Sequence, residues 1–101
     1  MSAYIICDVQ VKDRDYLQQY LDLSVHTLKP YGGQFLAQAG DLEIIEGDWK
    51  PGVLVIAEFP SMGKARAWYE SVEYSKALKV KPLALSRNMI LVDGVHRHQP
   101  P

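Results

Sequence analysis

Residues 53–78 constrain the fold most, because they hold a strand, an abrupt stop and a helix in direct succession. The segment 53–59 (VLVIAEF) is apolar and rich in β-branched side chains, interrupted only by Glu58, which is typical of a strand covered on both faces. Pro60 ends the strand because it lacks a backbone N–H, and Ser61 supplies an oxygen that can cap a helix. The inward stripe of that helix is predicted to hold Met62, Ala65, Tyr69 and Val72, with Trp68 at its margin.

The N-terminal half predicts a strand, a helix and further strand. Residues 3–11 (AYIICDVQV) alternate between two faces and predict the first strand. Asp13 can cap the helix that follows, and the run PYGG ends it. The inward residues of this helix are predicted to be Leu17, Tyr20, Leu21, Ser24 and Leu28. Two strand-like pieces follow, 34–38 and 42–46; we interpret residues 39–41 as a bulge in one long edge strand, with a tight turn as the alternative.

The C-terminal half completes the pattern. Ser71 can begin a further helical turn, which Pro82 limits, and residues 87–93 (RNMILVD) predict the last strand. The inward residues of that turn are predicted to be Tyr74, Ala77 and Leu78. Strand, helix, strand, strand, helix, strand is the order of an α+β, ferredoxin-like βαββαβ fold, a four-stranded antiparallel sheet with helices on one face. We expect one such domain over residues 1–95 and a flexible C-terminal tail at 96–101.

The sheet face opposite the helices needs cover of its own. It carries either Leu54 and Ile56 or the set Val53, Val55 and Phe59, so water on that face would meet a sizeable apolar patch. A second copy of the same sheet, packed face to face, would bury this apolar surface without requiring any other protein. The sequence therefore predicts a homodimer with a barrel-like space between two sheets, a dimeric α/β barrel.

Composition argues against several classes of function. A net charge of −1 and a pI near 6.3 leave no basic excess for nucleic acid. No apolar stretch approaches the roughly 18 residues of a membrane span, so we expect no membrane partner. The one cysteine, Cys7, indicates a small buried side chain and a reducing location, the cytoplasm. Without a Ser/His/Asp order, a phosphate loop or a Cys/His cluster, we expect no cofactor and no metal site.

Several short motifs together resemble a known family. They are YGG at 31–33 followed by FLA, EGDW at 46–49, EFPS at 58–61, AWYES at 67–71 followed by EY, and LVDG at 91–94. Over residues 3–95 the chain resembles the domain-of-unknown-function family numbered 1330, which belongs to the dimeric α/β-barrel superfamily. The resemblance implies the fold and the dimer but no reaction. Relatives in the wider superfamily include cofactor-independent monooxygenases, muconolactone-isomerase-like proteins and haem-handling enzymes, and shared architecture alone does not carry their activities over.

Two carboxylates interrupt otherwise apolar strands and are the candidate catalytic groups. Burial disfavours the charged form of a carboxylate, so Asp8 or Glu58 facing a dry cavity would make a general acid or base. The alternative for each is an ion pair or a solvent-wetted barrel mouth. The candidate ligand-binding residues are Tyr4, Trp49, Trp68, Tyr69, Tyr74 and Arg87. Trp49 has a second interpretation, as a lid over the end of the core.

Three functional hypotheses stay open. The first is a cofactor-independent enzyme that binds a planar or aromatic molecule between sheet and helices and moves a proton with a carboxylate. The second is a non-catalytic or stress-related dimer that binds a small molecule in a similar pocket. The third is a structural dimer whose aromatic residues are core. A ligand-sized cavity with converging polar atoms distinguishes the first two from the third.

Strand pairing sets where these groups lie. The ferredoxin-like order puts the first strand between the third and the fourth, and pairing midpoints places Cys7 near Ile56 and near Ile90. The neighbours of Cys7 on its face of the strand are the apolar Ile5 and Val9. We therefore predict that Cys7 takes no part in any activity. A change of one residue in this register would turn every side chain of a strand to the other face.

The same pairing separates the two carboxylates. Glu58 falls close to Tyr4, and Asp8 falls near the Arg87 end of the last strand, about 13 Å away by strand rise. We therefore predict two polar spots on the face turned to the dimer space, Glu58 with the Tyr4 hydroxyl and Asp8 with Arg87. A shift of one residue would turn Arg87 to the helix side.

Overall fold

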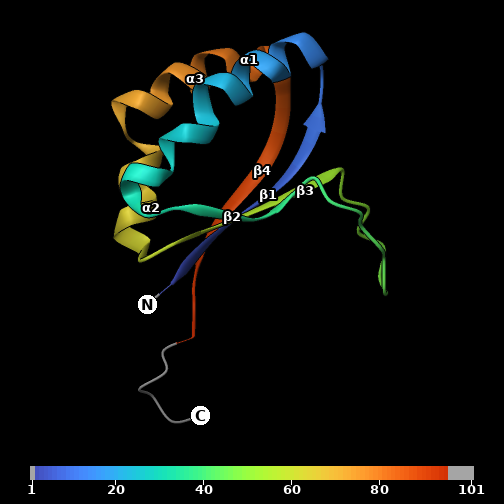
Figure 1. Ribbon diagram of the computed structural model, residues 1–101. Helices are drawn as coiled ribbons and strands as arrows, with labels where there is room; N and C mark the ends of the chain where they lie inside the picture. Colours follow the sequence, from blue (N-terminus) through green and yellow to red (C-terminus); the bar gives the residue numbers. More distant parts are fainter. Residues whose placement is uncertain (1, 96–101) are drawn as a thin grey trace.

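Four antiparallel strands form one sheet in the computed structural model, which describes residues 2–95 (Figure 1). The strands are β1 (Ala3–Val11), β2 (Gln34–Gln38), β3 (Val53–Phe59) and β4 (Leu85–Asp93), in the spatial order β2-β3-β1-β4. The helices are α1 (Arg14–Ser24), α2 (Met62–Tyr69) and α3 (Val72–Ala84), with short turns η1 (Val25–Thr27) and η2 (Lys29–Tyr31). This arrangement confirms the ferredoxin-like prediction, while the predicted tail at 96–101 lies outside the described residues.

All three helices lie on one side of the sheet, as predicted (Figure 1). α1 packs mainly along α3, whereas α2 lies close to β1 and β4. The predicted caps are confirmed, because the side chains of Asp13, Ser61 and Ser71 each accept a backbone N–H from the first turn of their helix. Within residues 2–95, no helix has the length and apolar character needed to cross a membrane.

The second helical region differs from its predicted stripe. α2 ends at Tyr69 and Ser71 starts α3 in a new direction, so Tyr69 is 42% exposed and Val72 is 74% exposed. Trp68, predicted at the margin, is buried instead. Pro82 does not stop α3, which continues to Ala84, because a proline near the C-terminal end removes only one helical hydrogen bond.

The core lies between the helices and the inner face of the sheet. Its buried strand residues include Ile5, Cys7, Val9, Ala57 and Phe59. Aromatic rings from both layers meet at its centre, with ring centroids 5.4 Å apart for Phe59 and Trp68 and 4.1 Å apart for Trp68 and Tyr74. The prediction that Cys7 is a small buried side chain is confirmed.

The register differs by one residue from the predicted midpoints. Cys7 pairs with Val55 and with Met89, rather than with Ile56 and Ile90. The position of Arg87 depends on this shift, because its Cα lies opposite Val9 and its side chain turns toward the helices. The predicted pair of Asp8 with Arg87 is therefore wrong.

The predicted strand at 42–46 is also wrong. β2 ends at Gln38, and residues 39–52 form neither strand nor helix in the structure. A register irregularity does interrupt β2, but between Phe35 and Ala37 rather than at Gly40. Ala39 takes a left-handed conformation with φ of 60°, which turns the chain out of the sheet. Residues 39–52 project on the side away from the helices (Figure 1). We call them the arm.

The outer face of the sheet is apolar at its centre. It carries Ile6 from β1, Leu54 and Ile56 from β3, and Ile90 and Val92 from β4. Ile90 is 58% exposed, and no helix among residues 2–95 covers this face. We call it the open face.

The backbone of Gly52, at the end of the arm, lies close to the backbone of Val9, and this contact leads to a first prediction. A Cβ built on Gly52 would lie 2.2 Å from the backbone oxygen of Val9, whereas a Cβ on Gly40 meets nothing within 4 Å. Gly52→Ala should lower the free energy of unfolding by about 1–3 kcal/mol, because backbone must move to relieve the overlap. Gly40→Ala is the control and should change it little. Urea unfolding at one protein concentration measures both, and equal midpoints for Gly52→Ala and wild type would contradict the assignment.

Candidate functional site

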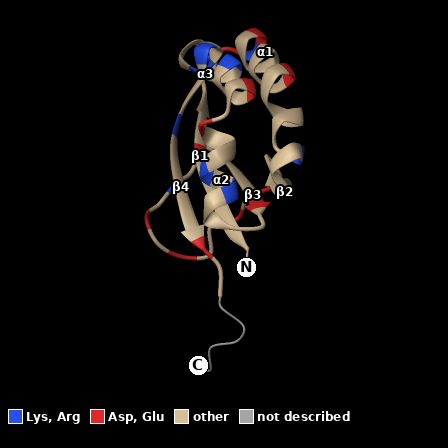
Figure 2. Ribbon diagram, turned by 90° about the vertical axis from the view of Figure 1, so that its left-hand side faces the viewer, with Lys and Arg blue, Asp and Glu red and all other residues tan. Residues whose placement is uncertain are grey.

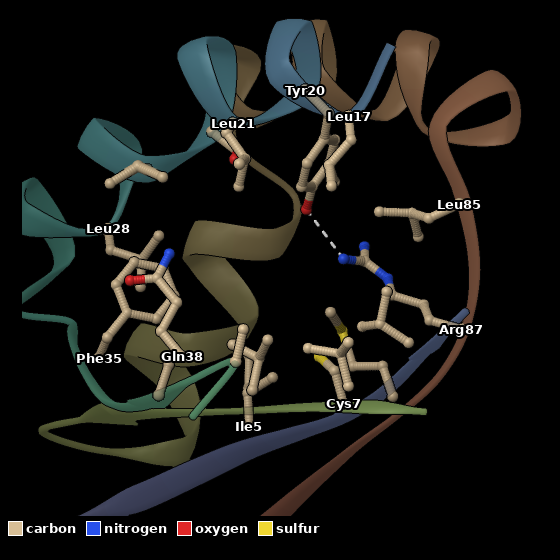
Figure 3. A pocket seen from close by; sticks show the side chains of 18 of the residues that line it. Ile5, Cys7, Leu17, Tyr20, Leu21, Leu28, Phe35, Gln38, Leu85 and Arg87 are labelled. Atoms are coloured by element: carbon tan, nitrogen blue, oxygen red, sulfur yellow. Dashed lines mark hydrogen bonds between the residues drawn. The ribbon is translucent and has the colours of Figure 1, made fainter. Parts of the chain in front are cut away.

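A cavity of about 170 Å³ lies between α1 and the inner face of the sheet (Figure 3). Side chains of α1, among them Leu17, Tyr20 and Leu21, form one wall, and side chains of the inner sheet face form the other. Most of its wall is apolar, and the lining includes Ile5, Val9, Leu17, Leu21, Val55 and Met89. Such a concave apolar space with a few polar groups is the usual form of a small-molecule site.

Arg87 is the charged group of this cavity. Its guanidinium extends from β4 toward α1, and Nη1 donates to the Tyr20 hydroxyl at 2.8 Å (Figure 3). Nη2 donates to the Tyr74 hydroxyl at 2.8 Å, and the two hydroxyl oxygens lie 2.5 Å apart. The arginine therefore links β4 to both α1 and α3 at the wall of the cavity.

The positive charge has only neutral partners within residues 2–95. Two of the five N–H donors of Arg87 have protein acceptors, and both acceptors are tyrosine hydroxyls. Arg87 is half-buried and stays protonated at physiological pH, and a cation removed from water normally has a carboxylate beside it. Arg87 is thus equipped to bind an acidic oxygen of a ligand in the cavity.

The hydroxyl of Tyr74 is held in its neutral form. Burial raises the pKa of Tyr74 well above its ordinary value, the neighbouring Tyr20 raises it further, and Arg87 partly offsets both. The Tyr74 ring packs against Trp68, whose Nε1 donates to the Thr27 hydroxyl at 2.9 Å. These contacts fix the side chains that hold Arg87.

Of the predicted ligand-binding residues, the structure brings Trp68, Tyr74 and Arg87 together at the cavity, with Trp68 and Arg87 in its lining. Tyr69 packs on the outer side of this group, where its ring contacts Trp68 and Tyr74. Tyr20 was predicted only as a core residue. Its hydroxyl accepts from Arg87 because that side chain turns inward. The only sign of this contact in the sequence is a tyrosine, a residue with a polar end, on the inward stripe of a helix.

Asp8 and Trp49 lie on the other side of the sheet. Asp8 accepts from Trp49 Nε1 at 3.1 Å and from the Gly52 backbone N–H at 2.9 Å, which ties the arm to β1. Trp49 is 61% exposed, so its interpretation as a lid over the core is wrong. These two residues form a structural contact at the foot of the arm and do not line the cavity.

Glu58 lies opposite Tyr4 on the open face, as predicted. Gln34 Nε2 donates to its carboxylate at 3.0 Å. This bond from Gln34 lowers the pKa of Glu58, with further contributions from Ser2 and Tyr4, while partial burial opposes them. The carboxylate is therefore held in its ionised form, and it does not line the cavity.

Cys7 lines the cavity near Arg87 (Figure 3). Burial raises the pKa of the Cys7 thiol, and the charge of Arg87 only partly offsets this. The thiol is therefore mostly protonated at neutral pH, which suits a packing side chain and not a nucleophile. Among residues 2–95, no group of three or more His, Cys, Asp or Glu side chains is arranged to hold a metal ion.

A family model covers residues 2–95, and its description is domain of unknown function (DUF1330). The chain belongs to this family. The resemblance expected from the sequence motifs is confirmed. The sequence matches no curated protein.

Solved structures show the same fold at low sequence identity. A protein of unknown function from Rhodopseudomonas palustris aligns with a TM-score of 0.75 at 18% identity, covering 94% of this chain and 83% of that one. SnoaB, a cofactor-independent oxygenase from Streptomyces nogalater, aligns with a TM-score of 0.66 at 9% identity over 94% of each chain. A dimeric ferredoxin-like protein of unknown function from Thermobifida fusca aligns with a TM-score of 0.54 at 20% identity, covering 90% of this chain and 89% of that one.

The raised pKa of Tyr74 makes a second prediction. Tyr74→Phe removes an acceptor of Arg87 and should lower the free energy of unfolding by about 1.5–3 kcal/mol at pH 7. A raised pKa in the folded state gives stability that is complete below the ordinary tyrosine pKa and is lost as pH rises past about 10. The stability of Tyr74→Phe should therefore fall less steeply above that pH than the wild-type stability does.

Tyr16→Phe is the matched control, because Tyr16 is an exposed tyrosine on α1. Urea unfolding at pH 7, 9, 10 and 11 compares the three proteins. Parallel pH profiles for Tyr74→Phe and wild type would contradict the assignment.

Proposed function

We propose that this protein binds a small planar or aromatic compound carrying an acidic oxygen, in the cavity between α1 and the sheet. The observation that carries the proposal is the Arg87 guanidinium, which meets neutral tyrosine hydroxyls inside an otherwise apolar space. The flat apolar part of the ligand would contact strand and helix side chains. Its acidic oxygen would accept from the free N–H groups of Arg87.

The size of the cavity supports a compound of one or two rings. Its volume is about 170 Å³, and an engineered apolar cavity of about 150 Å³ is enough to bind benzene. Drug-sized ligands need about 300–1,000 Å³. A substituted phenol or naphthol is therefore a better match than a larger polycyclic compound.

A cation in a low-dielectric site favours the deprotonated form of such a ligand. The charge of Arg87 would lower the pKa of a bound phenol or enol and stabilise the anion. This supports the second candidate function, cofactor-independent catalysis on the bound compound, to which the fold shared with the oxygenase SnoaB adds an analogy of architecture. Asp8 and Glu58 are acid–base candidates only for a ligand on the open face, since neither lines the cavity.

We also propose that the protein is a homodimer joined through the open face. The apolar side chains of Leu54, Ile56 and Ile90 lie side by side there, and burial of such a surface is the main driving force for association. The related structure from Thermobifida fusca is a dimer with the same fold. The single cysteine supports a location in the reducing cytoplasm.

Binding of 2-naphthol tests the cavity. Fluorescence titration at pH 7.5 should show saturable binding to the wild type, and Arg87→Met should weaken it about 10- to 100-fold, the worth of a charge-assisted hydrogen bond. Arg14→Met, at an exposed arginine that begins α1, and Glu58→Gln, on the open face, are controls that should bind like the wild type. Unchanged affinity in Arg87→Met, or loss of affinity in Glu58→Gln, would contradict the proposed site.

Sedimentation equilibrium tests the dimer. Wild-type protein should be dimeric at micromolar concentration, and Ile90→Asp should shift it toward monomer because a charge would be buried in the interface. Val72→Asp is the control, since Val72 is exposed on the helix side of the sheet. A monomeric wild type would contradict the proposed homodimer.

A further inference from the structure

The arm exposes an unusual amount of apolar surface. Its apolar side chains Leu42, Ile44, Ile45 and Trp49 are all exposed, and Ile45 reaches 85%. Residues 39–52 also lack strand or helix hydrogen bonding within the described part of the chain. Contiguous exposed apolar side chains on an extended segment mark a surface that binds another molecule.

Both ends of the arm are fixed to the sheet. At its start, the Ala39 N–H donates to the Leu54 backbone oxygen at 3.1 Å. At its end, Asp8 accepts from Trp49 and from the Gly52 backbone, and Asp8 belongs to the open face. The arm therefore has a defined direction, and it projects on the same side of the sheet as the open face (Figure 1).

We propose that the arm clasps a second copy of this chain docked on the open face, and that it contacts the β4 edge of that copy. This inference rests on the homodimer proposed above. Facing sheets pack about 10 Å apart, and half of the arm, about seven residues, spans about 23 Å in extended form. The arm is thus long enough to pass the partner's sheet and reach its helix side.

A two-fold axis parallel to the strands, the orientation that closes two facing sheets into a barrel, selects the β4 edge. The sheet has β2 at one edge and β4 at the other. A two-fold axis that runs between facing sheets, parallel to the strands, brings the β2 edge of each copy over the β4 edge of the other. Because the arm continues directly from β2, each arm then lies beside the partner's β4, and the contact occurs twice.

Charge complementarity supports the same contact. The arm carries Asp41, Glu43, Glu46 and Asp48 against one basic residue, Lys50. A groove between α2 and β4 is lined by one cation, Arg66, one carboxylate, Glu70, and apolar side chains that include Met89 and Leu91. The exposed Lys64 belongs to the same helix. Figure 2 shows acidic residues along the loop that precedes β3 and basic residues on α2. One chain therefore carries both an acidic apolar arm and a groove whose apolar wall and Arg66 can receive it.

A charge-reversal experiment tests the clasp. Glu43→Lys with Glu46→Lys in one protein, and Arg66→Glu in another, should each raise the dimer dissociation constant about tenfold or more, because like charges would then face each other. A protein with all three substitutions should return to within a few fold of the wild type. Asp22→Lys with Glu73→Lys, on the outer helix layer, changes the net charge equally and should leave the constant unchanged.

Sedimentation velocity over a dilution series measures each constant, and urea unfolding checks that every variant folds. Wild-type-like association of the arm variant would overturn the clasp. Weakened association of the arm variant without any effect of Arg66→Glu, or without rescue in the combined protein, would overturn the assignment to the β4 edge. A monomeric wild type would instead refute the homodimer itself, and 2-naphthol binding reports on the cavity separately.

Discussion

The link from Arg87 to Tyr20 and Tyr74 is the interaction on which the rest of the site depends. It joins β4 to α1 and α3 across the cavity. With apolar side chains alone, the core would pack closely here and leave no cavity. Removing a charge from water is unfavourable unless it is hydrogen-bonded, so the two hydroxyls make an inward arginine acceptable. The other N–H donors of Arg87 have no protein acceptor among residues 2–95, and this supports the proposal of an acidic ligand in the cavity.

The two faces of the sheet hold different structural features. The inner face holds the core, the cavity and its cation, while the open face holds the apolar surface, Glu58 and the anchor of the arm at Asp8. Strand alternation makes this separation possible, because neighbouring residues of β1 point to opposite faces. Ligand binding and association can therefore be altered by separate substitutions, which is how the two proposals are tested independently.

The arm illustrates a general difficulty for sequence interpretation. Residues 42–46 have the composition of a strand, but a strand needs a neighbour with free backbone groups, and β3 begins only at Val53. Four acidic residues and three glycines in the arm weaken any pairing within the chain further. An apolar segment that fails to pair within its own chain retains its capacity to pair elsewhere, and in the proposed homodimer the second copy would be its partner.

The sequence by itself determined the element order, the helix caps and the placement of the first and third strands at the core. These features depend on local chemistry: Asp13, Ser61 and Ser71 cap helices because their side chains accept nearby N–H groups, and β-branched runs favour strands. It also placed Glu58 close to Tyr4, because the strand order was right even though the predicted register was offset by one residue. Trp68, Tyr74 and Arg87 were found as candidate residues, although their geometry was not.

Only the tertiary structure decided which face Arg87 occupies, and with it the identity of the site. A register shift of one residue turns a strand side chain to the opposite face, and no local pattern in RNMILVD distinguishes the two registers. The inward register was selected by packing of β4 beneath α1 and α3, where Tyr20 and Tyr74 supply acceptors from positions far apart in the chain. Whether a polar side chain in a strand is solvated, paired or placed in a cavity is a property of such long-range contacts, which is why the carboxylates looked more functional in the sequence than the arginine did.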